Sequence, residues 1–392
     1  MTARPTVAVI GAGPAALACA HRLRAEPGIR VVMIAPEGRA DYLPGALAVA
    51  TGDSTLDRFR RPVAIGGVEV VPARAEGIEP GRVRVDGSDL EAQAVVAAPG
   101  LALEPLDPAL GPAAGPRGGE RAVRVVAFWD LDGAAAAAPA IEALERGILT
   151  VVIASPLYRC PPAPYGLAIR LARRAERLGR PVRVRLTTPE PRPLVAIGSE
   201  VGEYLAGACA EAGVEVEFDV HPDPAALAAG QVTDHAGDVL PTDLAVVVPP
   251  HRSHPLLAGL AGTEPLVTVD TRGRTTTEGI YVAGDAAAGP YPRAVAPAVL
   301  SGLAAAEGAL ADLGFGVDAE DGAGGPTPEL DCFVDRGGGL YGRIQVRYPG
   351  GPPPTGRPEV EIDPSGPAET VGFDAALRRW RAVCSERASP LA

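Results

Sequence analysis

The stretch Val7-Ala8-Val9-Ile10-Gly11-Ala12-Gly13-Pro14-Ala15-Ala16 carries the main fold signal of this chain. Its four leading apolar residues predict a strand that is buried on both faces. Gly11 permits a tight turn, Gly13 lets the backbone approach a pyrophosphate, and Ala16 permits close packing of a helix on the strand. The following helix directs its N-terminal N–H groups at the phosphates, and a second strand at 31–34 completes a βαβ unit. The stretch therefore predicts a dinucleotide-binding domain.

The residue that usually holds the ribose of a dinucleotide is missing from its expected place. An acidic residue normally ends the second strand. Here that position holds Ala35, and Glu37 lies two residues further on. Two interpretations stay open: Glu37 binds the ribose from the loop, or the adenosine end is held less specifically.

Composition limits the class of protein. The chain has 392 residues, enough for two or three domains, and 47% of them are hydrophobic, enough for large cores. The net charge of −12 argues against nucleic-acid binding. The chain contains no lysine, so all 36 basic residues are arginine. Five cysteines in a reducing compartment do not indicate a framework of structural disulfides.

The N-terminus and the hydropathy suggest a location. The strand signal begins by Val7, which leaves no room for a signal peptide, and no apolar run approaches the length of a transmembrane span. We therefore expect a cytoplasmic protein, or one bound peripherally to the cytoplasmic face of the membrane.

A second nucleotide-binding signal lies far downstream, in Gly279-Ile280-Tyr281-Val282-Ala283-Gly284-Asp285-Ala286. This strand ending in Gly-Asp resembles the second FAD motif of the flavoprotein disulfide reductase superfamily, in which the Asp matching Asp285 hydrogen-bonds the ribityl chain. The segment Val95–Gly100 resembles the strand and turn that return to the dinucleotide in two-dinucleotide flavoproteins. Together the motifs predict one FAD site, with these cofactor-binding residues: Gly11, Gly13, Ala16, Glu37, Gly100, Gly284, Asp285 and Arg293.

A second α/β unit, which begins at Ala122, lacks a second glycine-rich loop. Its strand at 150–153 is followed by Ala154-Ser155-Pro156-Leu157-Tyr158-Arg159-Cys160-Pro161-Pro162-Ala163-Pro164-Tyr165. Proline has no N–H to offer a phosphate and blocks a tight glycine turn. The loop is therefore unsuited to a nicotinamide dinucleotide, and it presents Cys160 instead.

Two cysteine motifs resemble one known family. The segment Arg159–Tyr165 closely resembles the first redox-cysteine motif of the sulfide:quinone oxidoreductases and of the flavin subunit of flavocytochrome c sulfide dehydrogenase. Asp331-Cys332-Phe333-Val334-Asp335, followed by glycines at 337–339, resembles the setting of their second redox cysteine. Weaker similarity is found in Phe128-Trp129, Val248-Pro249-Pro250 and Val269-Asp270.

The resemblance implies that Cys160 and Cys332 are a redox pair, each expected in a Pro- or Gly-rich loop. Arg159 would favour the thiolate of Cys160, and a disulfide beside a flavin can exchange two electrons with it. The alternative is that both cysteines are buried and inert. The other three are expected to be core or incidental: Cys19, Cys209 and Cys384.

The resemblance also shows a departure. The family usually has Pro-Lys near the flavin, whereas this chain has Pro292-Arg293. Arginine keeps a positive charge there but cannot lose its proton as lysine can. His251 and His254 have no accompanying cluster of Cys or carboxylate ligands, so no metal site is expected; a solvated loop is favoured over a histidine that moves protons.

The expected fold class is α/β, with two Rossmann-like dinucleotide-binding domains and a small C-terminal α+β segment. We expect the FAD-binding domain in two parts, 1–121 and 265–313. Between them we expect a second Rossmann-like domain at 122–264 that carries Cys160. The C-terminal segment, 314–392, would carry Cys332. Smaller features are a β-meander at 68–98, connections at 101–121 and 314–329, and a Pro-rich segment at 349–367.

The last helix is predicted to be amphipathic. One face carries Phe373, Leu377, Trp380 and Cys384, and arginines 378, 379, 381 and 387 lie on or near the other faces. A basic amphipathic helix with a tryptophan suits a membrane surface. The alternative is a helix docked on its own protein or on a second subunit.

By resemblance, the chain is an FAD-dependent enzyme that oxidises sulfide, or a small thiol or persulfide, through a Cys160–Cys332 disulfide and reduces a quinone. The absent signal peptide disfavours an exported flavocytochrome subunit. A pyridine-nucleotide-dependent reductase is a further alternative, disfavoured by the missing glycine loop. A non-catalytic flavin-binding scaffold is the third, suggested by Ala35 and Arg293. Covalent attachment of FAD and homo-oligomer formation stay open.

Overall fold

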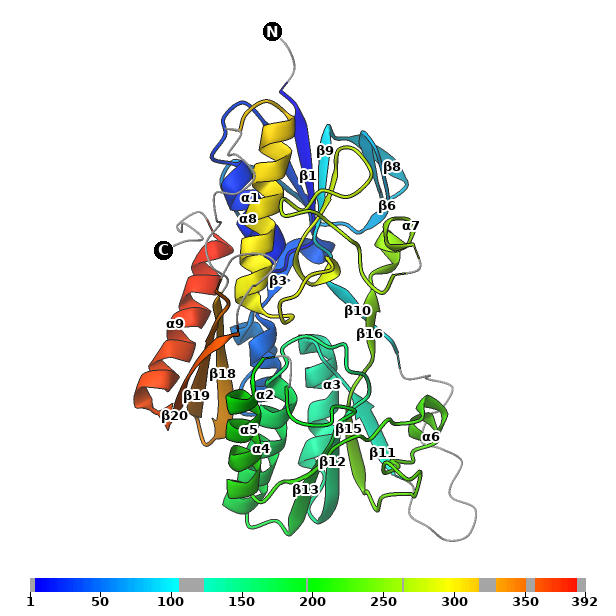
Figure 1. The fold of residues 1–392 in the computed structure, drawn as a ribbon, viewed down its shortest axis with the longest axis vertical. Coiled ribbons are helices and arrows are strands. Elements are labelled where there is room, and N and C mark those ends of the chain that lie inside the picture. The colour runs from blue at the N-terminus through cyan, green and yellow to red at the C-terminus, as the bar shows by residue number, and fades with distance from the viewer. Residues whose placement is uncertain are drawn as a thin grey trace.

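The first α/β unit is built around strand β1, which lies inside a five-stranded parallel sheet (Figure 1). The computed structural model describes residues 4–105, 123–194, 197–262, 264–316, 329–349 and 357–385. The strand order is β17-β9-β1-β2-β5, so a strand from far along the chain completes the sheet. The strands are β1 Thr6–Ile10, β2 Arg30–Ile34, β5 Val68–Val71, β9 Ala94–Ala97 and β17 Ile280–Val282.

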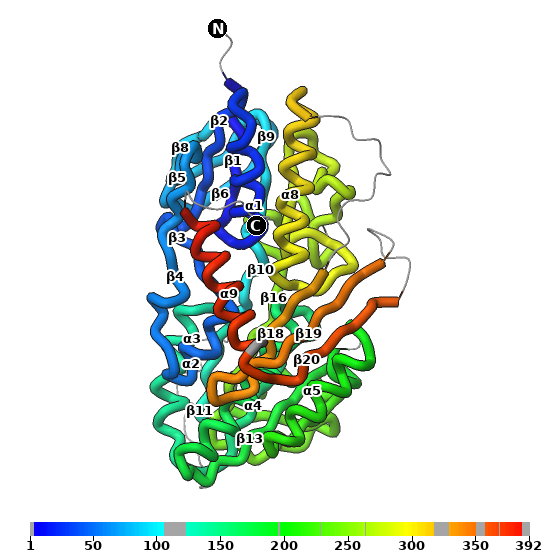
Figure 2. Tube along the Cα trace, turned by 90° about the vertical axis from the view of Figure 1, so that its left-hand side faces the viewer, coloured from blue at the N-terminus to red at the C-terminus, as the bar shows by residue number. Residues whose placement is uncertain are grey.

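Two helices of this unit, α1 (Pro14–Leu23) and α8 (Val295–Asp312), lie side by side in both views (Figures 1 and 2). Their backbones approach closely because Gly302 of α8 faces Ala15 of α1. A Cβ atom on Gly302 would lie 2.1 Å from the Ala15 carbonyl oxygen. Among the described residues, α8 is the one helix long and apolar enough to cross a membrane, and in this fold it packs along α1.

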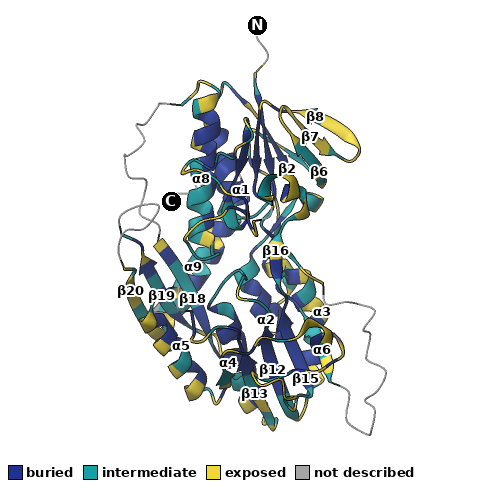
Figure 3. Ribbon diagram, turned by 45° about the vertical axis from the view of Figure 1, so that its right-hand side comes forward, coloured by how far each residue is buried: buried dark blue, intermediate teal, exposed yellow. Residues whose placement is uncertain are grey.

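The second α/β unit is another five-stranded parallel sheet, with the order β11-β15-β12-β13-β14. Its inner strands are dark blue in Figure 3 because they are buried on both faces. The strands are β11 Arg124–Ala127, β12 Gly147–Ile153, β13 Val182–Thr187, β14 Glu215–Glu217 and β15 Leu244–Val248. The helices are α3 Leu131–Glu142, α4 Ala163–Arg177, α5 Ser199–Glu211 and α6 Pro224–Ala228. The short helix α7 (Ala258–Ala261) lies beside the first unit (Figure 1).

Smaller elements connect and flank the two units. An antiparallel ribbon of β10 (Leu101–Leu103) and β16 (His251–Ser253) runs between them. The predicted meander over 68–98 is wrong at its ends, because β5 and β9 join the parallel sheet and only three strands form the meander. Those strands are β6 Ala75–Glu79, β7 Arg82–Val85 and β8 Ser88–Glu91. The remaining elements are β3 Arg39–Asp41, β4 Arg60–Pro62, α2 Ala46–Ala50 and short 3₁₀ turns at Pro36–Gly38, Leu43–Gly45, Leu56–Arg58, Pro255–Leu257 and Gly284–Ala286.

The C-terminal segment is a three-stranded antiparallel sheet followed by a helix. It comprises β18 Glu329–Gly337, β19 Leu340–Arg347, β20 Glu359–Gly366 and α9 Pro367–Val383. Cys332 lies within β18, paired with Ile344 of β19, so the expected loop setting of this cysteine is wrong. Part of the Pro-rich segment is also strand β20. Residues 106–122, 317–328, 350–356 and 386–392, which include most of the two predicted connections and Arg387, lie outside the described part of the chain.

The apolar face of α9 is covered by the protein itself. Phe373, Leu377 and Trp380 are buried, and the Phe373 ring stacks on Tyr341 with centroids 4.3 Å apart. The ring of Tyr42, from the first unit, lies 5.5 Å from that of Trp380. The apolar face therefore docks on its own chain, the alternative that the sequence left open, and the exposed face of α9 carries the arginines.

Candidate functional site

The turn after β1 contains two glycines in different surroundings: only glycine fits at Gly11, whereas Gly13 borders open space. Gly11 has φ +111°, and a Cβ there would lie 2.3 Å from the Ala98 carbonyl oxygen. Its N–H donates to the Ile34 carbonyl across a 2.9 Å distance, which fixes the turn. A Cβ on Gly13 would meet nothing within 4 Å. The N-terminus of α1 therefore opens onto space that a phosphate can enter.

Three adjacent strands end at the same edge of the first sheet. Ile10 of β1 pairs with Ala97 of β9, and Ala97 pairs with Val282 of β17. The turns that follow these strands carry Gly11, Gly100 and the Gly284-Asp285 pair. The structure thus brings the distant motifs together at the carboxyl edge of a parallel sheet, where ligands bind in open α/β folds.

The turns at Gly100 and Gly284 and the residue Ala16 show how closely these segments pack around α1. Gly100 has φ +73°, and a Cβ there would meet nothing within 4 Å. Ala16 is fully buried. Gly284 has φ +70°, and a Cβ there would lie 3.0 Å from the Cβ of Ala15. The second FAD-type motif therefore packs directly on the first turn of α1.

The Asp285 carboxylate lies near two cationic side chains. Burial raises its pKa, and the nearby cations Arg159 and Arg293 oppose this rise. No hydrogen bond to this carboxylate is found among the described residues. An acceptor group of this kind, set at a strand edge, is suited to receive hydroxyl hydrogen bonds from a bound ligand.

Cys160 lies in a strained turn that several bonds hold in place. It has φ +58°, a left-handed conformation that is rare for a residue other than glycine. Its N–H donates to the Arg293 carbonyl at 2.7 Å, and its carbonyl accepts from Ala163 N at 2.9 Å, at the start of α4. Arg159 donates to the Trp129 carbonyl at 2.6 Å, and the Trp129 indole donates to the Arg159 carbonyl at 2.7 Å.

A half-buried carboxyl group, that of Glu190, anchors the other end of the Cys160 loop. Glu190, just beyond β13, accepts hydrogen bonds from the hydroxyls of Tyr158, Tyr165 and Thr188 at 3.3, 3.2 and 3.3 Å. Burial raises the pKa of Glu190. No local sequence pattern marks Glu190, because it meets Tyr158 only after the chain has passed through α4 and β13.

Cys160 and Cys332 lie close enough that the charge of one affects the other. Burial raises the pKa of Cys160 to about 11, assisted by Asp285 and opposed by Arg159. Burial also raises the pKa of Cys332 far above its usual value, with further contributions from Cys160 and Asp331. Both thiols are free in this structure. The expectation that Arg159 favours the Cys160 thiolate is correct in direction, but burial outweighs it.

Some groups near the cysteines were not singled out as functional from the sequence. Burial and the negative charges of Cys160 and Cys332 raise the pKa of Tyr42. His251 is 5% exposed, within β16, so the favoured interpretation of a solvated loop is wrong for this residue. Its Nδ1 donates to the Pro249 carbonyl at 2.8 Å. Burial, assisted by Arg159, lowers its pKa to about 3, so the ring is neutral.

The site fits a bound flavin dinucleotide by several observations. The space at Gly13 and Gly100 is open, and the carboxylate of Asp285 has no hydrogen-bond partner within the part of the chain that the structure describes. Two buried nitrogens, Arg159 Nε and His251 Nε2, have no hydrogen-bond partner among the described residues. Buried polar atoms are rarely left unpaired, so these atoms are suited to a polar ligand. Glu37 is exposed and forms an ion pair with Arg39, at the carboxyl edge beyond β2.

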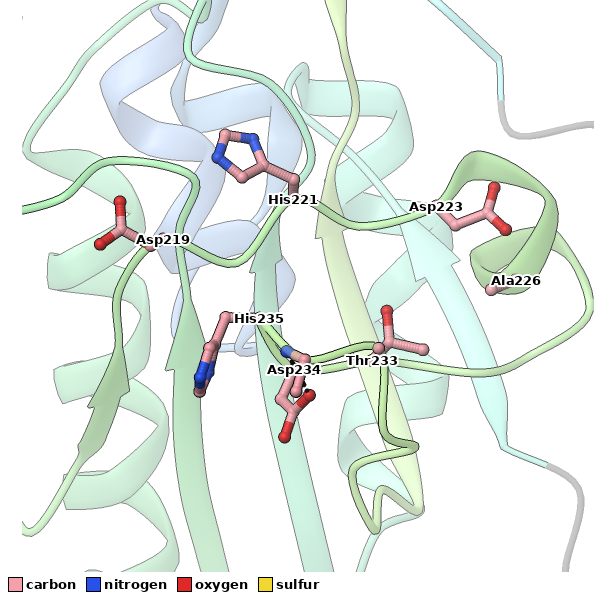
Figure 4. Close-up of a pocket in the computed structure, with 9 residues that line it drawn as sticks. Asp219, His221, Asp223, Ala226, Thr233, Asp234 and His235 are labelled. Carbon is pink, nitrogen blue, oxygen red and sulfur yellow. Dashed lines mark hydrogen bonds between the residues drawn. The ribbon is translucent and has the colours of Figure 1, made fainter.

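A separate pocket lies in the second unit, between the loop after β14 and a hairpin near residue 235 (Figure 4). Its volume is about 390 Å³, and its lining includes Asp219, His221, Asp223, Asp234 and His235. Asp234 accepts hydrogen bonds from the N–H groups of its own turn. In the described part of the chain, no group of three or more His, Cys, Asp or Glu side chains could hold a metal ion.

The two parallel units, with the first sheet completed by β17, define a two-domain Rossmann-like fold of the kind that binds dinucleotides. Residues 166–302 match the family described as pyridine nucleotide-disulphide oxidoreductase. A search of the curated proteins finds no match.

Solved structures with the same fold were found. The sulfide:quinone oxidoreductase from the hyperthermophilic bacterium Aquifex aeolicus superposes with a TM-score of 0.77 at 18% identity, covering 97% of this chain and 92% of that chain. Reduced Bacillus anthracis CoADR-RHD gives a TM-score of 0.62 at 15% identity, covering 88% of this chain and 62% of that chain. An NAD-dependent persulfide reductase from A. fulgidus gives a TM-score of 0.61 at 18% identity, covering 87% of this chain and 64% of that chain.

These comparisons confirm the predicted fold class, and they confirm the resemblance to sulfide:quinone oxidoreductases at the level of the fold. The family match and the shared fold support an FAD-binding disulphide oxidoreductase, and the predicted cofactor, FAD, is confirmed at this level. The domain boundaries and the individual site residues stay predictions.

Proposed function

We propose that the protein oxidises sulfide, or a small thiol or persulfide, through Cys160 and Cys332, and passes the electrons through FAD to a quinone. The observation that carries the proposal is that Cys160 and Cys332 lie near enough for one charge to affect the other, with Asp285 also affecting Cys160, although the cysteines are 172 positions apart in the sequence. The proline-filled loop after β12 supports a sulfur substrate over a nicotinamide dinucleotide.

The proposed chemistry balances as a two-electron oxidation. Hydrosulfide attacks a Cys160–Cys332 disulfide, breaks the S–S bond, and leaves a persulfide on one cysteine and a thiolate on the other. Transfer of the outer sulfur to a second thiol or sulfide leaves both cysteines reduced. When bound, FAD would supply the two-electron acceptor that re-forming the Cys160–Cys332 disulfide requires. In sum, hydrosulfide becomes a sulfane sulfur, one proton and two electrons.

The surroundings of the two thiols support different roles for them. Cys160 has Asp285 and the cation Arg159 as its charged neighbours, whereas those of Cys332 are the other thiol and Asp331, which both raise its pKa. A thiol of lower pKa leaves faster in disulfide exchange. We therefore assign Cys332 as the sulfur that is attacked and Cys160 as the leaving thiolate, which Arg159 stabilises.

The experiment that tests this function compares electron donors. Under anaerobic conditions, sulfide is expected to bleach the flavin absorbance of the purified protein rapidly, while NADH and NADPH leave it oxidised. The physical reason is the lack of a glycine turn at 154–162, where proline removes N–H donors. Rapid bleaching by either nucleotide, with none by sulfide, would replace the proposal with a pyridine-nucleotide-dependent reductase.

The proposed quinone acceptor requires access to a membrane, and the exposed face of α9 is the candidate surface. Arg378 and Arg379 are exposed there, while the apolar face is docked. Each arginine near an anionic surface contributes about 1 kcal/mol. Reversing both charges, in Arg378→Glu/Arg379→Glu, is therefore expected to weaken binding to anionic vesicles by about tenfold or more.

The matched control reverses two exposed arginines on the meander, Arg82→Glu/Arg84→Glu, which changes the net charge equally. Co-sedimentation with vesicles of anionic phospholipid measures both variants at low and at physiological salt. Equal binding by the two variants would show that net charge, rather than α9, controls association.

A further inference from the structure

Arg170 of α4 lies at a buried junction of three parts of the chain. Its Nε donates to Thr51 Oγ1 at 2.8 Å, and its Nη2 donates to Asp53 Oδ2 at 2.7 Å, both in the loop after α2. Its Nη1 forms an ion pair with Asp335 of β18. The side chains of Arg170 and Asp335 are 8% and 3% exposed. The guanidinium thus uses all its nitrogens to hold two separate segments.

The elements that Arg170 joins are the ones that carry the two cysteines. α4 begins immediately after the Cys160 turn, and β18 carries Cys332 three residues before Asp335. The helix and the strand are in direct contact, because a Cβ on Gly166 of α4 would lie 3.2 Å from Asp335 N. The position of α4 relative to β18 therefore sets the separation of the two thiols.

The energetics of the Arg170 junction indicate that it positions α4 and β18 rather than adding to the stability of the fold. Burying charged groups costs desolvation energy that their attraction only partly returns, so a buried ion pair is weak evidence of net stabilisation. The planar guanidinium is rigid and directional, so it fixes the angles at which its partners meet. Asp335 is itself oriented, since its Oδ1 accepts from Gly337 N at 2.9 Å.

We propose that Arg170 is a positioning residue for the redox pair: through Asp335 and Asp53 it holds α4 against β18 so that Cys160 and Cys332 can join in an unstrained disulfide. The inference rests on the proposed function, in which these cysteines react with each other. A disulfide tolerates only a narrow range of Cα separations, and strain makes it more reducible. Loosening this junction therefore raises the reduction potential of the pair.

The test measures the thiol–disulfide equilibrium of the FAD-bound protein in mixtures of reduced and oxidised glutathione. Formation of the disulfide from the two thiols releases two protons and two electrons. Oxidised glutathione takes up these protons and electrons and becomes two molecules of reduced glutathione. After the thiols are trapped by alkylation, mass spectrometry quantifies the cross-linked Cys160–Cys332 peptide. Arg170→Lys is expected to lower the equilibrium constant for disulfide formation about tenfold, equivalent to about 30 mV.

A second variant keeps the test valid if unpaired buried charges prevent folding. Arg170→Met/Asp335→Asn removes the charge from both partners, and the same shift is expected. Arg174→Met is the control, since Arg174 lies on the same helix but pairs with the exposed Glu142. The equilibrium constant for disulfide formation in this variant should equal that of the wild type.

The outcomes separate the two proposals. Variants that melt at a lower temperature but keep the wild-type equilibrium constant would show that Arg170 is only structural, and the inference would be overturned while the proposed function stands. A wild-type protein that never forms the cross-link, even with excess oxidised glutathione, would overturn the pairing and therefore both proposals.

Discussion

Replacing Cys332 by serine, or Cys160 by serine, is expected to slow reduction of the bound flavin by sulfide by about a thousandfold or more. Either substitution removes the disulfide that sulfide must attack, and a hydroxyl cannot take its place in thiol exchange. The rate is measured by anaerobic stopped-flow absorbance of the flavin. Because the two residues act as a unit, the double variant is expected to be little slower than either single one.

Cys209→Ser provides the control for this loss. Cys209 is fully buried in α5 and belongs to the core, so its replacement removes a thiol without touching the proposed pair. We expect FAD content to be retained in all three single variants, since none of these cysteines is expected to bind the cofactor. Flavin reduction at the wild-type rate in both Cys160→Ser and Cys332→Ser would rule out the disulfide route.

Adding one methyl group in Gly302→Ala is expected to destabilise the FAD-binding unit by about 3 kcal/mol and to release FAD. The new Cβ would lie 2.1 Å from the Ala15 carbonyl oxygen, and backbone atoms cannot rotate out of the way. The helices α1 and α8 must separate, which moves the N-terminus of α1 away from the turn at Gly11. Thermal unfolding and the flavin content after gel filtration measure the two effects.

The control places the same substitution in a helix with free space. A Cβ on Gly207, in α5, would meet nothing within 4 Å. Gly207→Ala is therefore expected to raise stability by about 0.5–1 kcal/mol, because alanine loses less backbone freedom in a helix than glycine. If both alanine variants bind FAD and melt like the wild type, the close approach of α1 and α8 is not what holds the site.

Much of the α/β framework could be predicted from local patterns. The run at 7–10, the glycines after it and the strand at 31–34 indicate the first βαβ unit, because a buried parallel strand and a glycine turn each have a local signature. The strand ending in Gly284-Asp285 was also found. The extent of the meander was wrong, since the pattern within 68–98 does not distinguish a strand of the parallel sheet from a strand of the antiparallel one.

Three features could be predicted from local sequence alone: the strand–turn–helix that suits a dinucleotide, the absence of a second glycine turn at 154–165, and the amphipathic character of α9. Each of them depends on residues that are close together in the sequence. Features that depend on long-range contacts required the folded chain. The apolar face of α9 docks on Tyr42 and Tyr341 from two other segments. Burial outweighs Arg159 at Cys160, since the pKa of a thiol responds to every group packed around it. The Arg170–Asp335 junction likewise joins positions that no local pattern could connect.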